Sequence, residues 1–267
     1  MEKDMEPLLR DYLNKIKQIH PIVHCITNTI TVNDCANMVL ALGASPTMAH
    51  HTLEVEEITA GTNALVCNLG ATECLEAMEL AGEKADALGH PIVLDPVGVA
   101  GSTFRRNKCM ALMERVHTTC IRGNYSEILA LMRQRNTAVG VDAADTDMDL
   151  DALQQFADEV HGIVVASGEK DYITDGKRLY VCERGHRMMS HITGSGCMSS
   201  VALATFLAVE PSIESANACC HFLGQMGELA AKQTEERAGG TMTFVNSFWM
   251  LCLCSAFYGK IIRSCRI

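Results

Sequence analysis

The chain has 267 residues, 48% hydrophobic and 20% charged. It can therefore bury a sizeable core, and this composition excludes wholesale disorder. Its formal net charge of −10 argues against a general binder of nucleic-acid backbones, because lysine and arginine are not in excess. The charge is still compatible with a bound nucleotide, since backbone amides and Mg²⁺ can balance phosphate locally.

The N-terminal segment and the cysteines indicate an intracellular protein. Residues 1–20 are charged and lack the apolar stretch of a signal peptide. The 13 cysteines include no C-x-x-C pair, which argues against zinc ribbons and thioredoxin-type sites. No apolar run reaches the roughly 18 residues that a membrane span requires. We therefore expect a cytoplasmic protein whose thiols are mostly reduced and buried.

Short apolar runs alternate along the chain with segments of helical periodicity. The runs are rich in β-branched residues and predict buried strands of a parallel sheet at 21–27, 64–70, 91–97, 117–124 and 162–168. Helices are predicted between them, at 31–43, 71–89, 102–116, 125–136 and 149–160. Glycines at the ends of helical stretches, Gly43, Gly82 and Gly89, suggest left-handed caps.

The last third of the chain follows a different pattern. Residues 171–185 predict a hairpin that turns at Asp175-Gly176. Everything after residue 194 reads as helical up to the C-terminus. The alternation before it predicts an α/β fold with a mostly parallel sheet flanked by helices on both faces. Since no repeat or linker interrupts the sequence, we expect residues 1–267 to form one domain.

Ligands of such sheets bind beyond the carboxyl ends of the strands. The residues expected there are polar, glycine-rich and acidic in two places: His24, Thr27, Asn28, Asn68, Gly70, Asp95, Pro96, Gly98, Arg122, Gly123, Asn124, Glu127, Ser167, Gly168, Glu169 and Lys170. Because parallel strands place these ends at one edge, we predict a single ligand site there.

The stretch HITGSGCMSS, residues 191–200, leads into an apolar helical run. Glycines at a helix start leave backbone N–H groups unpaired and let another group approach closely, and the helix dipole adds positive charge. Gly194 and Gly196 therefore suit a phosphoryl group. Taken alone, the motif is equally compatible with a turn into a buried helix.

Two acidic residues follow neighbouring predicted strands. Asp95 and Glu127 are hard oxygen ligands and suit Mg²⁺ held partly through water. Either one alone could instead be a solvated loop residue or, for Glu127, part of a helix start with Asn124. Arg122 could pair with a phosphate or form a structural ion pair.

Several stretches together resemble hydroxyethylthiazole kinases, thiamine-salvage enzymes with a ribokinase-like fold. They are HCITN, NDCAN and GASPTMA near the N-terminus, LDPVG at 94–98, RGNYSEI at 122–128 and TGSGC at 193–197. The similarity spans roughly residues 20–255, and the matches occur in the right order. Their combination is far more specific than any one of them.

The resemblance implies ATP-dependent phosphorylation of the primary alcohol of 4-methyl-5-(2-hydroxyethyl)thiazole, with Mg²⁺. It also implies a homotrimer with substrate sites between subunits. By this resemblance, ATP is bound by Arg122, Ser167 and Asn124, and the metal is bound by Asp95 and Glu127. The thiazole is bound by Asn28, Met48 and Gly194.

Ribokinase-like enzymes usually carry an aspartate base after the glycine turn, where this chain has Cys197. A thiol at a helix N-terminus can be partly ionised. Phosphoryl transfer through a loose transition state nevertheless demands little from a base. We interpret Cys197 as lying beside the substrate hydroxyl with an optional base role, and Gly194 and Gly196 as donors to the moving phosphoryl group.

Some positions depart from the thiazole kinase pattern. The turn reads GSGC where GAGC is expected, Ser167 stands where Thr is common, and His50-His51 replaces acidic residues. Adjacent histidines can bind metal, although an exposed loop pair is the simpler interpretation.

Two alternative functions remain open from the sequence. One is another ribokinase-like enzyme, such as a hydroxymethylpyrimidine kinase or a repair enzyme for hydrated nicotinamide cofactors, and these should carry Asp in place of Cys197. The other is a non-catalytic thiazole or nucleotide sensor, which would bind ligand without releasing ADP. A Rossmann dehydrogenase is disfavoured because no G-x-G-x-x-G follows the first strand.

Overall fold

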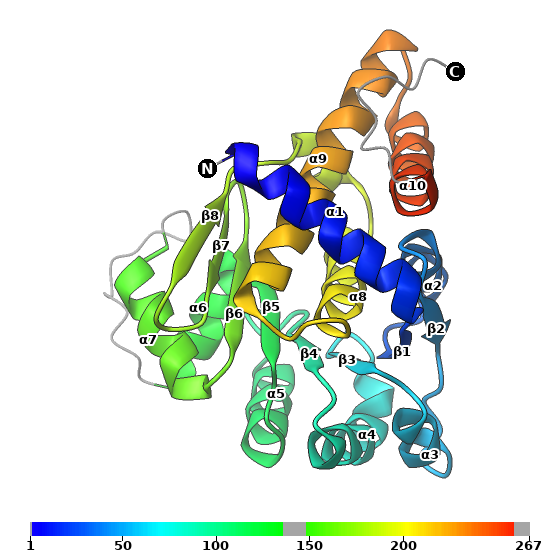
Figure 1. The fold of residues 1–267 in the computed structure, drawn as a ribbon. Helices are drawn as coiled ribbons and strands as arrows, with labels where there is room; N and C mark the ends of the chain where they lie inside the picture. The colour runs from blue at the N-terminus through cyan, green and yellow to red at the C-terminus, as the bar shows by residue number, and fades with distance from the viewer. Residues whose placement is uncertain (1, 136–147, 259–267) are drawn as a thin grey trace.

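The structure, a computed structural model, describes residues 2–135 and 148–258. A central sheet lies between two layers of helices (Figure 1). The sheet has eight strands in the order β2-β1-β3-β4-β5-β6-β7-β8. The strands are β1 (Ile22–Ile26), β2 (Ser45–Thr47), β3 (Ala64–Asn68), β4 (Ile92–Asp95), β5 (Cys120–Asn124), β6 (Ile163–Ser167), β7 (Asp171–Thr174) and β8 (Leu179–Cys182).

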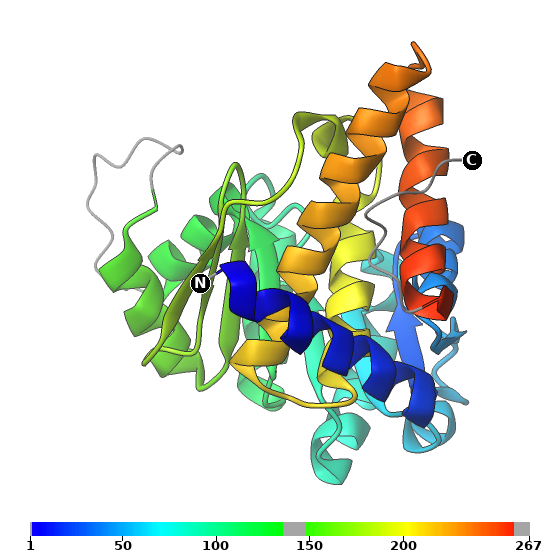
Figure 2. The same cartoon turned by 45° about the horizontal axis from the view of Figure 1, so that its top comes forward.

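The helices connect these strands and then form the C-terminal part of the described chain. They are α1 (Glu2–Ile19), α2 (Val32–Ala41), α3 (Val55–Ala60), α4 (Leu75–Leu88), α5 (Thr103–Arg115), α6 (Tyr125–Gln134), α7 (Leu150–Val160), α8 (Ser195–Leu207), α9 (Ile213–Glu236) and α10 (Thr241–Tyr258), with short 3₁₀ turns η1 (Thr72–Cys74) and η2 (Arg187–His191). The last two helices lie side by side in both views (Figures 1 and 2).

The sheet is mostly parallel, as the sequence predicts. Strands β2, β1, β3, β4, β5 and β6 pair in parallel, whereas β7 and β8 extend the sheet as an antiparallel hairpin. The hairpin turns at Asp175-Gly176, and Gly176 has the positive φ of +86° that favours glycine. The predicted hairpin is therefore confirmed.

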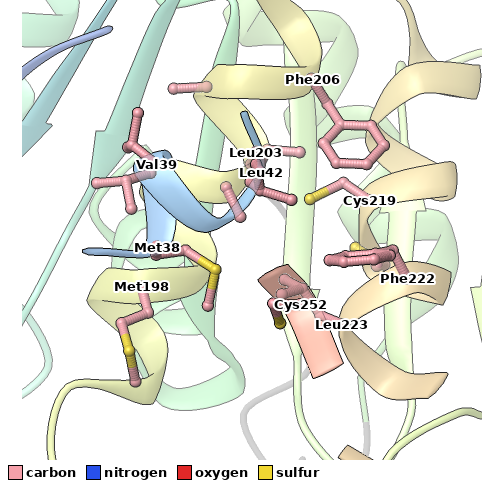
Figure 3. Packing of buried hydrophobic residues seen from close by; sticks show 14 of the residues in the cluster. Met38, Val39, Leu42, Met198, Leu203, Phe206, Cys219, Phe222, Leu223 and Cys252 are labelled. Carbon is pink, nitrogen blue, oxygen red and sulfur yellow. The ribbon is translucent and has the colours of Figure 1, made fainter. Parts of the chain in front are cut away.

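Alternating residues of the central strands face two separate hydrophobic layers. On β6, Ile163 and Val165 pack with one cluster, while Val164 and Ala166 pack with the other. The first cluster includes residues of α1, α2, α8, α9 and α10, and the second includes residues of α3 to α7. Figure 3 shows the first layer, where Met38 of α2, Met198 of α8 and Phe222 of α9 are part of the same core.

The predicted strands and helices are found with small shifts at their ends. The strand predicted at 91–97 ends at Asp95, and the helix predicted at 125–136 is described as α6, Tyr125–Gln134, with residue 136 outside the described part. The edge strand β2 and the helix α3 have no counterpart among the predicted elements. Strand β2 has only three residues and includes Pro46, which fits an edge position.

One predicted helix cap is wrong. Gly89 ends α4 in the left-handed conformation, and Gly43 follows α2 with a φ of +87°. Gly82, in contrast, lies inside α4. A Cβ atom there would come within 3.3 Å of Val116 Cγ1, so this glycine allows close helix packing and does not end the helix.

The structure also shows where the thiols lie and how apolar its helices are. Every cysteine whose side chain is described is free and buried. Within residues 2–135 and 148–258, no helix combines the length and the hydropathy needed to cross a bilayer.

Candidate active site

A cavity of about 1240 Å³ opens at the carboxyl ends of β4, β5 and β6 and is bordered by the start of α8. This is the edge of the sheet where the sequence predicts a ligand site. Most of the predicted site residues line it: Asp95, Arg122, Asn124, Glu127, Ser167, Gly194, Gly196 and Cys197.

The start of α8 presents unpaired backbone donors. Gly194 is the N-cap residue, with a φ of +81°. The amide of Met198 donates to Gly194 O, and that of Ser195 donates to Ile192 O. No described residue accepts a hydrogen bond from the amides of Gly196 and Cys197. These two N–H groups lie at the positive end of the helix dipole and can bind an anion.

Asp95 ends β4 and is almost completely buried. Its Oδ2 accepts hydrogen bonds from Asn68 Nδ2 at 2.9 Å and Ser200 Oγ at 2.8 Å. Burial raises the pKa of Asp95 to about 6, with Arg122 opposing the shift and Glu127 adding to it. The carboxylate is therefore held in place but weakly compensated by protein charge.

Glu127 and Asn124 form a capping box at the start of α6. Asn124 Oδ1 accepts from the Glu127 amide at 2.9 Å, and Glu127 Oε2 accepts from the Asn124 amide at 2.9 Å. Glu127 Oε1 also accepts from the Gly98 amide at 2.9 Å. Glu127 therefore is part of a helix start with Asn124, one of the roles that the sequence allows. The same hydrogen bonds fix its carboxylate beside the cavity.

The two carboxylates fit Mg²⁺ bound mainly through water and phosphate oxygens. Asp95 Oδ2 is occupied by two donors, but no described residue donates to its Oδ1. Among the described side chains, no three His, Cys, Asp or Glu residues gather into a metal cluster. Mg²⁺ at nucleotide sites usually takes one or two carboxylates and completes its shell with phosphates and water.

Arg122 projects from β5 and supplies the cavity with positive charge. Its charge lowers the pKa values of Asp95 and Asp171, both of which burial raises to about 6. Asp171, the first residue of β7, accepts a hydrogen bond from the Gly168 amide at 3.3 Å. Arg122 therefore interacts electrostatically with two carboxylates. It also lines the cavity, where its guanidinium can bind a phosphate.

Ser167 lies beside Asn124, its register partner on β5. Its hydroxyl donates to Gly123 O at 3.2 Å. The next residue, Gly168, packs on a ring: a Cβ at this position would come 2.5 Å from Tyr125 Cζ. The Tyr125 ring in turn stacks on Tyr172, with ring centroids 5.8 Å apart. This part of the cavity wall is closely packed.

Cys197 is a buried, hydrogen-bonded thiol. Its sulfur accepts from Asn68 Nδ2 at 3.1 Å and from Asn28 Nδ2 at 3.4 Å. Burial raises the pKa of Cys197, and the Asp95 carboxylate raises it further, while hydrogen bonds with Thr31, Asn68 and Asn28 act in the opposite direction. The partial ionisation that a helix N-terminus can favour is therefore outweighed here, and the thiol is neutral near pH 7.

The predicted thiazole residues are only partly brought together. Gly194 lines the cavity, and Asn28 reaches it through its hydrogen bond to Cys197. Met48 follows the edge strand β2 and packs against the hydrophobic core, and it is not among the residues that line the cavity. Buried His24 holds the adjacent backbone through a 2.8 Å hydrogen bond between its Nε2 and Ala49 O.

His50 and His51 form no metal site with other described side chains. Both are exposed, and His51 Nδ1 accepts a hydrogen bond from the Leu53 amide at 3.2 Å. The simpler interpretation, an exposed loop pair, fits this geometry.

Sequence reasoning missed some residues of the site. Ser200 is bonded to Asp95, and its position three residues after Cys197 on a helix was an available signal. The 183–190 segment also lines the cavity through residues such as Arg184 and Arg187, and no motif marked it. Asn68 is among the polar residues expected at the strand ends, but the sequence does not predict that it donates to both Asp95 and Cys197.

Comparisons with known proteins agree on one family. A family profile described as the hydroxyethylthiazole kinase family matches residues 13–253. A hydroxyethylthiazole kinase from Exiguobacterium sibiricum is 40% identical over 225 residues, which cover 83% of this chain and 88% of the relative.

The solved structures that this chain resembles include a member of the same family. A hydroxyethylthiazole kinase from Pyrococcus horikoshii superposes with a TM-score of 0.81 and 31% identity, covering 92% of both chains. A ribokinase-like protein from Enterococcus faecalis has a TM-score of 0.67 at 10% identity, over 96% of this chain and 95% of that one. The second likeness concerns the fold alone and confirms the ribokinase-like architecture.

Proposed function

Because the chain belongs to the hydroxyethylthiazole kinase family, we propose that it transfers the γ-phosphoryl group of ATP to the hydroxyl of 4-methyl-5-(2-hydroxyethyl)thiazole. The products are the thiazole phosphate and ADP. The observation that carries this proposal is the start of α8, where Gly196 and Cys197, whose amides have no acceptor among the described residues, line the same cavity as Asp95 and Arg122. This geometry suits a phosphoryl group that gains charge during transfer.

ATP binds along the ends of β5 and β6 in this proposal. The Arg122 guanidinium contacts the phosphates, and Ser167 and Asn124 border the nucleotide at neighbouring strand ends. Mg²⁺ binds near Asp95 and Glu127, and when bound it neutralises phosphate charge. Because Asn68 and Ser200 hold Asp95, its carboxylate keeps a fixed direction toward the cavity.

The thiazole alcohol approaches from the side of Cys197 and Asn28. Cys197 positions the hydroxyl, and its raised pKa makes it a weak candidate for the base. Gly194 and Met48 contribute to the thiazole pocket. Met48 directly follows the edge strand β2 and is not among the residues that line the cavity of its own subunit. That placement supports a homotrimer in which the pocket is completed between subunits.

The reaction needs ATP and makes a phosphorylated vitamin precursor, so we assign the protein to thiamine biosynthesis in the cytoplasm. Hydroxymethylpyrimidine kinase activity is less well supported, because the residue after the glycine turn is Cys197 and not Asp. A sensor without catalysis is less well supported because the groups for phosphoryl transfer are all present in one cavity.

The direct test is ADP release by the purified protein with Mg²⁺-ATP and hydroxyethylthiazole. Parallel reactions contain hydroxymethylpyrimidine or no acceptor, and mass spectrometry identifies the product. We expect ADP and a thiazole phosphate only with the thiazole. Binding of the thiazole without turnover would support a sensor, and turnover of the pyrimidine alone would assign the protein to the related kinases.

A further inference from the structure

Asn68, the last residue of β3, connects two groups of the proposed reaction site. Its side chain is fully buried. Its Nδ2 donates to Asp95 Oδ2 at 2.9 Å and also to Cys197 Sγ at 3.1 Å. A primary amide has two N–H hydrogens, and here one serves each partner. A single group therefore joins the carboxylate to the thiol.

The orientation of this amide is fixed by its surroundings. Asn68 Oδ1 accepts a hydrogen bond from the Gly70 amide at 2.8 Å. Since a backbone N–H can only donate, the oxygen must face Gly70 and the NH₂ group must face Asp95 and Cys197. The parallel register also pairs Asn68 directly with Asp95. The side chain thus has little freedom to rotate or flip.

Position 70 must lack a side chain for this arrangement to exist. A Cβ atom there would come 2.7 Å from Asn68 Oδ1 and 3.1 Å from Asn28 Nδ2. Both amides converge on the same sulfur, because Asn28 Nδ2 also donates to Cys197 Sγ at 3.4 Å. Gly70 therefore leaves the space in which Asn28 and Asn68 together hold the thiol.

We infer that Asn68 is a positioning residue for phosphoryl transfer, an inference that rests on the proposed function. It fixes the distance between the phosphate side of the site, at Asp95, and the alcohol side, at Cys197. Asn28 and Asn68 both donate to the sulfur, and Thr31 also forms a hydrogen bond with it, so the thiol is held in one place beside the alcohol of the proposed reaction. A reacting oxygen displaced by about 1 Å can slow transfer by on the order of 100-fold.

A double-mutant cycle tests this inference. Asn68→Ala is made in the wild-type chain and in Cys197→Ala, and kcat is measured from thiazole-dependent ADP release. We expect Asn68→Ala to lower kcat by about 10- to 100-fold in the wild-type chain. In the Cys197→Ala background, the decrease in kcat caused by Asn68→Ala should be smaller by a factor of about three or more. A merely structural role would give the same factor in both backgrounds.

Asn63→Ala is the matched control, since Asn63 precedes β3 and its Oδ1 only accepts from the Ile22 amide at 2.8 Å. This variant should keep the wild-type kcat. Asn68→Leu is a second variant of similar size, which removes the NH₂ donor without adding a charge beside Asp95 and covers the case in which Asn68→Ala does not fold. Circular dichroism melting gives the folded fraction of each protein.

Equal factors in both backgrounds, or a kcat within about twofold of wild type for Asn68→Ala and Asn68→Leu, would overturn the inference. Failure of the proposed function has a different signature: the wild-type protein itself would release no thiazole-dependent ADP, and the inference would then fall with that function.

Discussion

Arg122 and Gly196 lie so close together that a methyl group on Gly196 would sit 2.7 Å from Arg122 Nη1. Gly196 belongs to the first turn of α8, and Arg122 belongs to β5. The helix that presents unpaired amides and the cation proposed to bind phosphate are therefore in direct contact. No larger residue fits between them without moving the guanidinium.

Gly196→Ala should impair catalysis much more than stability. The clashing atom is the far end of a flexible side chain, so Arg122 can swing away at small cost to folding. The displaced guanidinium and the added methyl should then lower kcat/KM for Mg²⁺-ATP by about 10- to 100-fold. Gly101→Ala is the control, because a Cβ at Gly101 meets nothing within 4 Å. Steady-state kinetics and thermal melting of both variants check the prediction, and equal activities would contradict it.

Cys197→Ala should retain measurable kinase activity. The thiol pKa lies above its ordinary value because of burial and the nearby Asp95, so little thiolate exists near pH 7. We expect kcat to fall by about tenfold or less, with the same pH profile between pH 6 and 8 as the wild-type protein. A general base would be worth about 100- to 10,000-fold, so a loss of that size would show that the thiol takes the proton.

Asp95→Asn should abolish turnover and yet stabilise the fold at neutral pH. Burial raises the folded-state pKa of Asp95 from 3.8 to about 6, so the folded chain binds this proton more tightly than the unfolded chain. The ionised carboxylate therefore destabilises the protein above pH 6, by about 3 kcal/mol at most, and this cost disappears as pH falls from 6 to 4. An Asn oxygen can still accept from Asn68 and Ser200.

Melting of the wild type and Asp95→Asn at pH 7.5 and pH 4.5 measures this difference. The gain in Tm from the substitution should be larger at pH 7.5 than at pH 4.5. Asp171 also titrates near pH 6, but it is present in both proteins and cancels in the comparison. A gain that does not depend on pH would mean that Asp95 contributes no such cost.

Gly194→Ala should destabilise the protein and misplace the start of α8. Gly194 has a φ of +81°, and a Cβ there would lie 2.3 Å from Thr31 Cγ2. Backbone strain and overpacking together should cost about 2–4 kcal/mol. Thr31→Ser removes the clashing methyl, so the double variant should recover part of the loss, although the strain at φ remains. Urea unfolding of both variants measures how much stability Thr31→Ser restores. If it restores none, the whole cost comes from backbone strain at Gly194.

The strands and the ligand edge were predictable because their signals are local. Runs such as 162–168 carry enough β-branched residues to identify a buried strand, and a parallel sheet places the ends of such strands together. The three-residue strand β2 and the six-residue helix α3 are too short to produce a periodic pattern. The predicted cap at Gly82 was wrong because a glycine is needed there for close contact with Val116, which lies far along the chain.

The site was predictable as a set of residues but not as a set of contacts. The sequence indicates that Asn124 and Glu127 begin a helix, and the structure adds that Glu127 also binds the Gly98 amide. That contact depends on how the loop after β4 folds back, which no local pattern encodes. The same holds for Asn68, whose bond to Cys197 exists only because α8 packs across β3.

The burial of the described cysteines gives the native chain a set of built-in probes. Cys25 on β1, Cys120 on β5 and Cys252 on α10 are each at most 1% exposed. An alkylating reagent can reach such a thiol only when its element opens. The rate of labelling at each position, read by mass spectrometry, would therefore map local opening along the sheet and the C-terminal helices without any engineered label.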